Sequence, residues 1–177
     1  MSYVKKYPLL SPLEMIERHD VLPSDSVHLG GLAMGANPED AKVEFIQRGA
    51  FLSILRWSIL KLKTGPKYSC HQYDFPLKAL SWFPKALAEF QRPPADGGLH
   101  AGAMVSKDQD VDGEMLAVGS TTQGYVLKNR SRDARGINAH PDFYRPVTLE
   151  MSYEMLNDRG LLRLWKELGE KYDAGEL

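Results

Sequence analysis

The chain has 177 residues, of which 43% are hydrophobic and 25% are charged, and its formal net charge is −1. This composition excludes a chain that is disordered along its whole length, and the length favours a single folded domain. The balanced charge gives no whole-chain signal for a nucleic-acid or membrane partner, so such a partner would need a local patch. We expect one domain over 1–177, with a possible subdivision near 92–98, where Pro and Gly are concentrated.

Cysteine usage and the N-terminal sequence bear on the compartment. Cys70 is the only cysteine, so no disulfide can form within the chain. The two lysines at positions 5 and 6 are not followed by the apolar run of a signal peptide. Both features are typical of a reducing compartment, and we expect a soluble, cytoplasmic protein without a membrane partner.

The first half of the chain has helical signals. Residues 11–14 have the form of a capping box, which predicts a short helix from Pro12 to about His19. Asn37 and Pro38 then predict a second helix start. We expect a long central helix over about 38–63, because the sequence is apolar on most sides from Ala50 onward.

A further helical pattern covers 75–91 and contains Pro84, which should kink or split that helix. Trp82 and Phe83 lie next to this proline. Their spacing is that of core residues, but an exposed aromatic pair at this position is also a candidate partner-binding patch.

The second half of the chain has strand signals. Residues 114–121 and 125–132 are short strand candidates, and 147–153 alternates strictly between apolar and polar residues. The stretch 161–172 then returns to helical spacing. The fold class expected is therefore α+β, with a helical N-terminal half, a small antiparallel sheet of about three strands and a closing amphipathic helix.

A row of cations is the first candidate site. On a strand, Lys128, Arg130 and Arg132 share one face and suit a phosphate backbone or another polyanion. The connection that follows adds Arg135, Tyr144 and Arg145 to this candidate site.

The same row has a structural explanation. Glu150 and Glu154 lie on the polar face of the alternating stretch 147–154. If the two strands pair, these carboxylates can form ordinary cross-strand ion pairs with the cations.

Two further groups of residues suggest a metal or catalytic site, but their spacing matches no known motif. Asp108, Asp110 and Asp112 resemble the start of a calcium loop, but the position of the required bidentate Glu is occupied by Gly119. The candidates for a nucleophile with its base, or for zinc ligands, are Cys70, His71, His100, His140 and Asp142. No zinc or triad spacing links them, so we expect no metal and no cofactor.

Three functions stay open on the sequence alone. The leading one is a non-catalytic protein-interaction or accessory module that binds another protein or itself. The second is a nucleic-acid-binding protein that uses the basic strand. The third is an enzyme with a Cys/His site.

Overall fold

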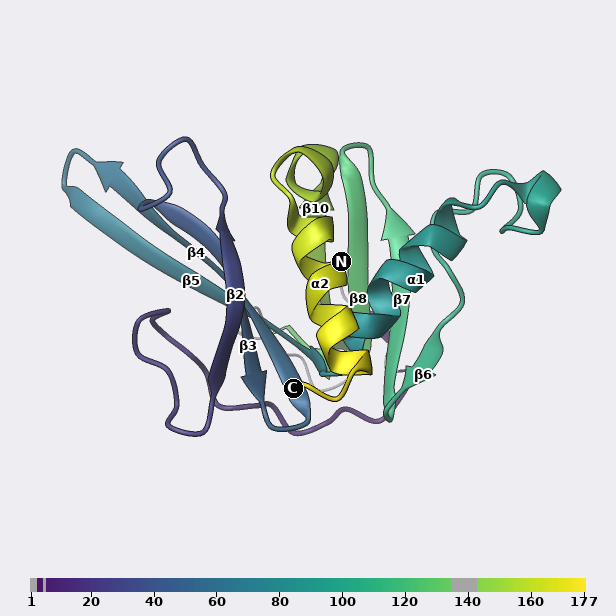
Figure 1. Ribbon diagram of the computed structural model, residues 1–177, viewed down its shortest axis with the longest axis horizontal. Coiled ribbons are helices and arrows are strands. Elements are labelled where there is room, and N and C mark those ends of the chain that lie inside the picture. The colour runs from purple at the N-terminus through teal and green to yellow at the C-terminus, as the bar shows by residue number, and fades with distance from the viewer. Residues whose placement is uncertain (1–2, 5, 135–142) are drawn as a thin grey trace.

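A computed structural model describes residues 3, 4, 6–134 and 143–177. It contains two four-stranded antiparallel sheets, a two-stranded ladder and two longer helices (Figure 1). The elements in chain order are β1 (Tyr3–Val4), β2 (Val27–Ala33), β3 (Ala41–Arg48), β4 (Phe51–Leu62), β5 (Gly65–Pro76), α1 (Ala79–Gln91), η1 (Pro94–Asp96), β6 (Gln109–Val111), β7 (Glu114–Ser120), β8 (Gly124–Asp133), β9 (Phe143–Tyr144), β10 (Pro146–Ser152), η2 (Glu154–Asp158) and α2 (Leu161–Asp173).

The N-terminal half is a sheet, so the predicted helical half and its long helix over 38–63 are wrong. The strands pair in the order β2-β3-β4-β5, and every pair is antiparallel. β3 and β4 are joined by the two-residue turn Gly49–Ala50, between the partners Arg48 and Phe51. Gly49 has φ +62, a conformation that glycine adopts at low cost and that suits a tight hairpin.

Burial on both faces explains why β4 resembles a helix in sequence. Leu52 and Ile54 point into the main core, whereas Leu55 points to the opposite face. On that opposite face Leu55 packs with Ile16 from the N-terminal segment. A strand that is buried on both sides loses its apolar–polar alternation, and a continuous apolar run remains.

The short helix predicted over 12–19 is also absent. This segment has no regular secondary structure and crosses the outer face of the N-terminal sheet. Its exposed residues are interrupted by Leu13, Ile16, His19 and Leu22, which are at least partly buried. Burial at every third residue is typical of an extended segment with three residues per turn. This period is close to the 3.6 residues per turn of an α-helix, so the sequence pattern resembles that of a helix.

The C-terminal half follows the prediction more closely. Strands at 114–120, 124–133 and 146–152 and the closing helix α2 are confirmed. They form an antiparallel sheet in the order β10-β8-β7-β6, in which the short edge strand β6 had not been predicted. Each sheet is therefore followed by one helix, α1 after the first and α2 after the second.

The two helices pack against each other and lie against the sheets, with α2 between the sheets in Figure 1. Trp165 of α2 is fully buried and contacts Phe45 of β3 and Phe83 of α1. Its indole N–H donates to the carbonyl of Ala79 over 3.0 Å. One apolar core therefore includes residues from both sheets and both helices.

α1 continues through Pro84. Proline has no N–H, so the carbonyl of Leu80 lacks its usual helical donor. Gly169 of α2 lies against this carbonyl, and a Cβ added to Gly169 would lie only 2.5 Å from the Leu80 oxygen. The missing side chain therefore permits the close approach of the two helices.

Candidate functional site

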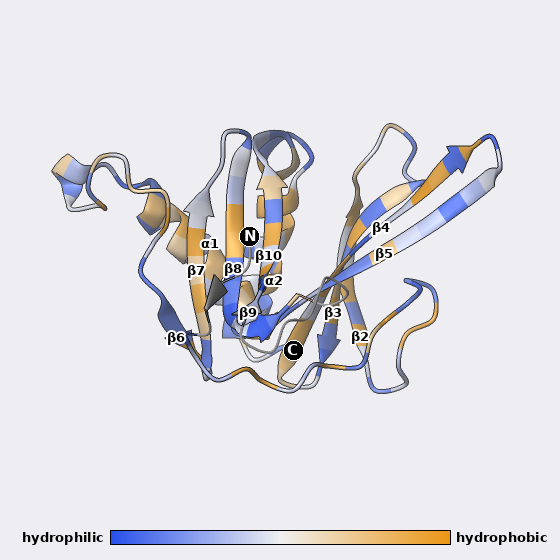
Figure 2. Cartoon of the chain, turned by 180° about the vertical axis from the view of Figure 1, so that it is seen from behind, coloured by the Kyte–Doolittle hydropathy of each residue, from blue (hydrophilic) through white to orange (hydrophobic). Residues whose placement is uncertain are grey.

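The hairpin formed by β4 and β5 has an unusual charge distribution. Its residues 51–73 contain four Lys or Arg residues and no Asp or Glu, although the whole chain has a net charge of −1. The distal part of the hairpin extends away from the body of the protein, with hydrophilic and hydrophobic residues mixed along β4 and mainly hydrophilic ones along β5 (Figures 1 and 2). The hairpin is therefore a locally cationic projection on a nearly neutral protein.

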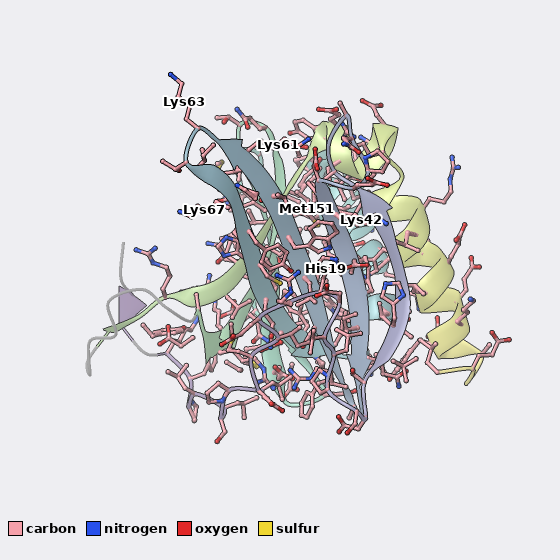
Figure 3. The ribbon with its side chains drawn as sticks, turned by 90° about the vertical axis from the view of Figure 1, so that its left-hand side faces the viewer. His19, Lys42, Lys61, Lys63, Lys67 and Met151 are labelled. Carbon is pink, nitrogen blue, oxygen red and sulfur yellow. The ribbon has the colours of Figure 1, made fainter. Side chains whose placement is uncertain are left out.

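Strand register places part of this charge on the outer face of the sheet, the face turned away from α2. Lys42 of β3 is directly opposite Trp57 of β4, and Lys61 is on the same face four residues further along β4. Lys61 has a 74% exposed side chain and lies 3.5 Å from Asp40. Figure 3 labels these lysines together with Lys63, at the end of the hairpin, and Lys67, which is opposite Leu60 and therefore lies on the other face of β5.

An aromatic cluster lies on the same face at the base of the projecting hairpin. The imidazole of His19 stacks on the indole of Trp57, with ring centroids 3.7 Å apart and an interplanar angle of 7°. Tyr68 of β5 completes the cluster, and the guanidinium of Arg18 lies 4.6 Å from its ring centroid. The indole N–H of Trp57 donates to Glu44 over 2.7 Å. We refer to His19, Trp57, Tyr68 and Arg18 as the aromatic cluster.

Burial shifts the pKa values of two residues of β5 in this region. It raises the pKa of Tyr68 to about 12, and it also raises the pKa of the neighbouring Cys70 thiol. Cys70 is opposite Trp57 on the outer face, whereas His71 points to the inner face. A protonated thiol with its histidine neighbour on the other face is poorly arranged for nucleophilic catalysis.

The remaining Cys/His candidates do not extend this site. His100 lies in the segment between α1 and β6, and His140 and Asp142 lie outside the described residues. Asp108 is in ion pairs with Lys6 and Arg130, and Asp110 accepts a hydrogen bond from the backbone of Gly113. In the described part of the chain, no three His, Cys, Asp or Glu residues gather as a metal-binding group.

The predicted row of basic residues on β8 is divided by the structure. Lys128 and Arg130 lie on the outer face of the C-terminal sheet, where Lys128 is opposite Thr148. Arg130 donates to Asp108 over 2.7 Å, and the side chains of the pair are only 18% and 8% exposed. Asp108 also accepts from Tyr7 over 2.6 Å.

Arg132 is separated from the other two cations. The β8–β10 register shifts between Pro146 and Val147, which pair with Asp133 and Asn129 respectively. Arg132 is buried and pairs with Glu114 over 2.5 Å. This bulge explains why a strict two-residue period fails at the end of β8.

The other residues of this prediction are dispersed. Tyr144 is buried, and Arg135 lies outside the described residues. Arg145 and Lys128 line a surface cavity of about 460 Å³ that also includes Glu150. Glu150 is directly opposite Val126 and not a cation, and Glu154 pairs with Arg159.

The predicted aromatic pair is also divided. Phe83 is completely buried beneath α2, whereas Trp82 is half-buried and donates to Gln109 over 2.7 Å. Trp82 and Phe90 line a second cavity of about 460 Å³ between α1 and the segment that leads to β6. Of the two aromatic residues, Trp82 is therefore the one that a partner can reach.

Comparisons with family models, with curated proteins and with solved structures give no significant match. No helix in the described ranges is both long enough and apolar enough to cross a bilayer.

Proposed function

We propose that this protein binds nucleic acid through the outer face of its N-terminal sheet and the projecting β4–β5 hairpin. The observation that carries the proposal is the acid-free, cationic stretch 51–73, which makes up most of the projecting β4–β5 hairpin on a chain of net charge −1. The residues proposed to contact phosphates are Lys42, Lys61, Lys63 and Lys67.

The physical basis is the release of counterions from a polyanion. Each lysine that neutralises a phosphate displaces a condensed cation, which favours binding at low salt. The hairpin also carries Leu60 and Leu62, which are 55% and 50% exposed. Strand register places these leucines on the face opposite Lys61, so the lysines alone supply the proposed phosphate contacts.

The proposed phosphate contacts are Lys42 and the hairpin lysines, and not the basic residues of β8. Arg130 and Arg132 are held by Asp108 and Glu114, so their charges are already compensated within the protein. Within the described residues, the hairpin lysines have no such buried partners, and Lys61 has only an exposed contact with Asp40. Exposed ion pairs contribute little and are readily exchanged for phosphate contacts.

A fluorescence anisotropy titration tests the proposal. Labelled single-stranded DNA, single-stranded RNA and duplex DNA are titrated with the protein between about 50 and 200 mM salt. The triple variant Lys61→Ala, Lys63→Ala, Lys67→Ala is expected to lose most of the affinity. Equal affinity of this variant and the wild type, or no binding by the wild type at low salt, would contradict the proposal.

The matched control removes the same charge elsewhere. Lys78, Lys166 and Lys171 are exposed and lie at the start of α1 and on α2. Replacing these three by Ala changes the net charge by the same amount as the hairpin variant. The control is expected to keep affinity within about twofold, because its charges lie away from the hairpin.

A protein-interaction module is the second candidate, and the cavity beside Trp82 favours it. Half-buried Trp82 and Phe90 supply apolar surface there, with Lys85 and Glu89 as charged neighbours. Self-association through this surface predicts that Trp82→Ala lowers the mass seen by light scattering at high protein concentration. A wild-type protein that is monomeric throughout would contradict self-association.

A further inference from the structure

The stack of His19 on Trp57 has the geometry of a nucleobase on a protein aromatic ring. The two rings are nearly parallel, at 7°, and their centroids are 3.7 Å apart. The hydroxyl of Tyr68 accepts a hydrogen bond from the backbone N–H of His19 and lies 2.9 Å from its Nδ1. A planar nitrogen heterocycle is thus both stacked and hydrogen-bonded on the outer face of the sheet, which also carries Lys42 and Lys61.

The chain around His19 is anchored on both sides, by Ile16 before it and by Leu22 after it, which pack in the same small core. Ile16 is buried in the small core beneath the segment, and its N–H donates to Gln72 over 2.8 Å. Beyond it, Glu17, Arg18, Asp20 and Val21 are exposed. The exposed residues between Ile16 and Leu22 can therefore move the His19 imidazole off Trp57 while both anchors stay in place.

We infer that the face of Trp57 is a nucleobase-binding subsite, and that His19 occupies it in the free protein. The inference rests on the proposed function and names its ligand as a single-stranded nucleic acid. Bases in a duplex are stacked on their neighbours and cannot reach this face without being unpaired.

The surroundings of Trp57 fit such a ligand. Tyr68 offers a hydroxyl that can donate to a ring nitrogen, as it already can to Nδ1 of His19. Lys42 lies directly opposite Trp57 and Lys61 lies further along the same face, where phosphates on either side of the stacked base would pass. One stacked base flanked by cations is the usual arrangement for binding a single strand.

His19 then acts as a competitor for the base. The observed affinity for a single strand is lowered in proportion to the fraction of molecules in which His19 covers Trp57. Removing the imidazole is expected to raise the affinity for single-stranded DNA about fivefold and to leave duplex affinity unchanged.

The first test compares His19→Ala with wild type in titrations of single-stranded and duplex DNA. His100→Ala is the matched control, because His100 is exposed and lies in a different part of the chain. Tighter binding of the single strand by His19→Ala alone supports the inference. Equal affinities for wild type and His19→Ala would overturn it.

The second test uses the wild-type protein and is independent of the stability of any variant. The imidazole protons of His19 lie above an indole, so their NMR signals are displaced by its ring current. Addition of oligothymidine is expected to move these signals to unstacked positions, and unchanged signals during saturable binding would overturn the inference. Binding that requires the hairpin lysines but not His19 displacement leaves the proposed function intact, whereas no binding at any salt removes both.

Discussion

Arg130 and Asp108 form an ion pair across 2.7 Å that links the middle of β8 to the segment before β6. Asp108 also accepts from the Tyr7 hydroxyl over 2.6 Å and from Lys6 over 3.1 Å. One largely buried carboxylate therefore connects the N-terminal segment with the C-terminal sheet.

This geometry predicts that Asp108→Asn destabilises the fold. The amide cannot accept the same set of hydrogen bonds and leaves Arg130 without its counter-charge, so we expect a loss of about 1–3 kcal/mol. Urea unfolding followed by tryptophan fluorescence measures it. Asp96→Asn, at an exposed acid of η1, is the control and should change stability by less than about 0.5 kcal/mol.

The same carboxylate predicts a pH dependence. Burial by itself would raise the pKa of Asp108, but the hydrogen bonds from Tyr7, Arg130 and Lys6 outweigh burial and hold the pKa below the ordinary value of 3.8. The unfolded chain therefore binds the proton more tightly than the folded chain. The stabilisation is present above 3.8 and is lost as the pH falls through the folded value, so Asp108→Asn should flatten the acid limb of stability. An unchanged acid limb would be incompatible with this role.

Tyr68 predicts a separate alkaline transition. Burial raises its pKa from 10.0 to about 12, so its contribution to stability is complete below pH 10 and declines as the pH approaches 12. Tyr68→Phe cannot ionise and is expected to lose less stability across this window than the wild type. Urea midpoints measured at several alkaline pH values test the difference, and parallel curves for the two proteins would refute it.

The close contact at Gly169 predicts that a side chain at this position lowers the stability of the fold. A methyl group at this position would meet the Leu80 carbonyl at 2.5 Å, so Gly169→Ala should destabilise the protein by about 1–3 kcal/mol despite the higher helix propensity of alanine. Gly35→Ala is the matched control, since its nearest contact would be 3.9 Å away. A stability for Gly169→Ala equal to that of the control would show that the helices can separate at no cost.

The C-terminal half was predictable because its local patterns are one-sided. β10 alternates from Val147 to Met151, with Val147, Leu149 and Met151 in the core and the intervening residues at least partly exposed. α2 places Trp165 and Leu168 in the core and exposes the opposite side. Each element is buried on one face only, so its period is visible in the sequence.

The N-terminal half was not predictable by the same patterns. Ile16 comes from a distant, irregular segment and buries the face of β4 that a two-layer fold would otherwise expose. The turn at Gly49–Ala50 was the local signal that a single helix could not account for. Gly49 follows the polar pair Gln47–Arg48 and precedes the apolar run, which is the position of a hairpin turn between two strands.

The candidate site was missed for a related reason. The basic residues of β8 attract attention because they alternate, but the partners Asp108 and Glu114 lie 22 and 18 residues away in sequence from Arg130 and Arg132. The hairpin cations are spaced irregularly, and their signal is the absence of acids from 51 to 73. Charge counted over a window of this length would have identified the hairpin.

Photo-crosslinking is the most direct test of the central claim that the β4–β5 hairpin contacts nucleic acid. A single-stranded oligonucleotide that carries 4-thiothymidine is irradiated with the wild-type protein, and the adducts are located by mass spectrometry. The account predicts adducts on peptides within 57–70, which are lost in the triple variant at Lys61, Lys63 and Lys67. Adducts confined to 124–133, or their complete absence at low salt, would contradict it.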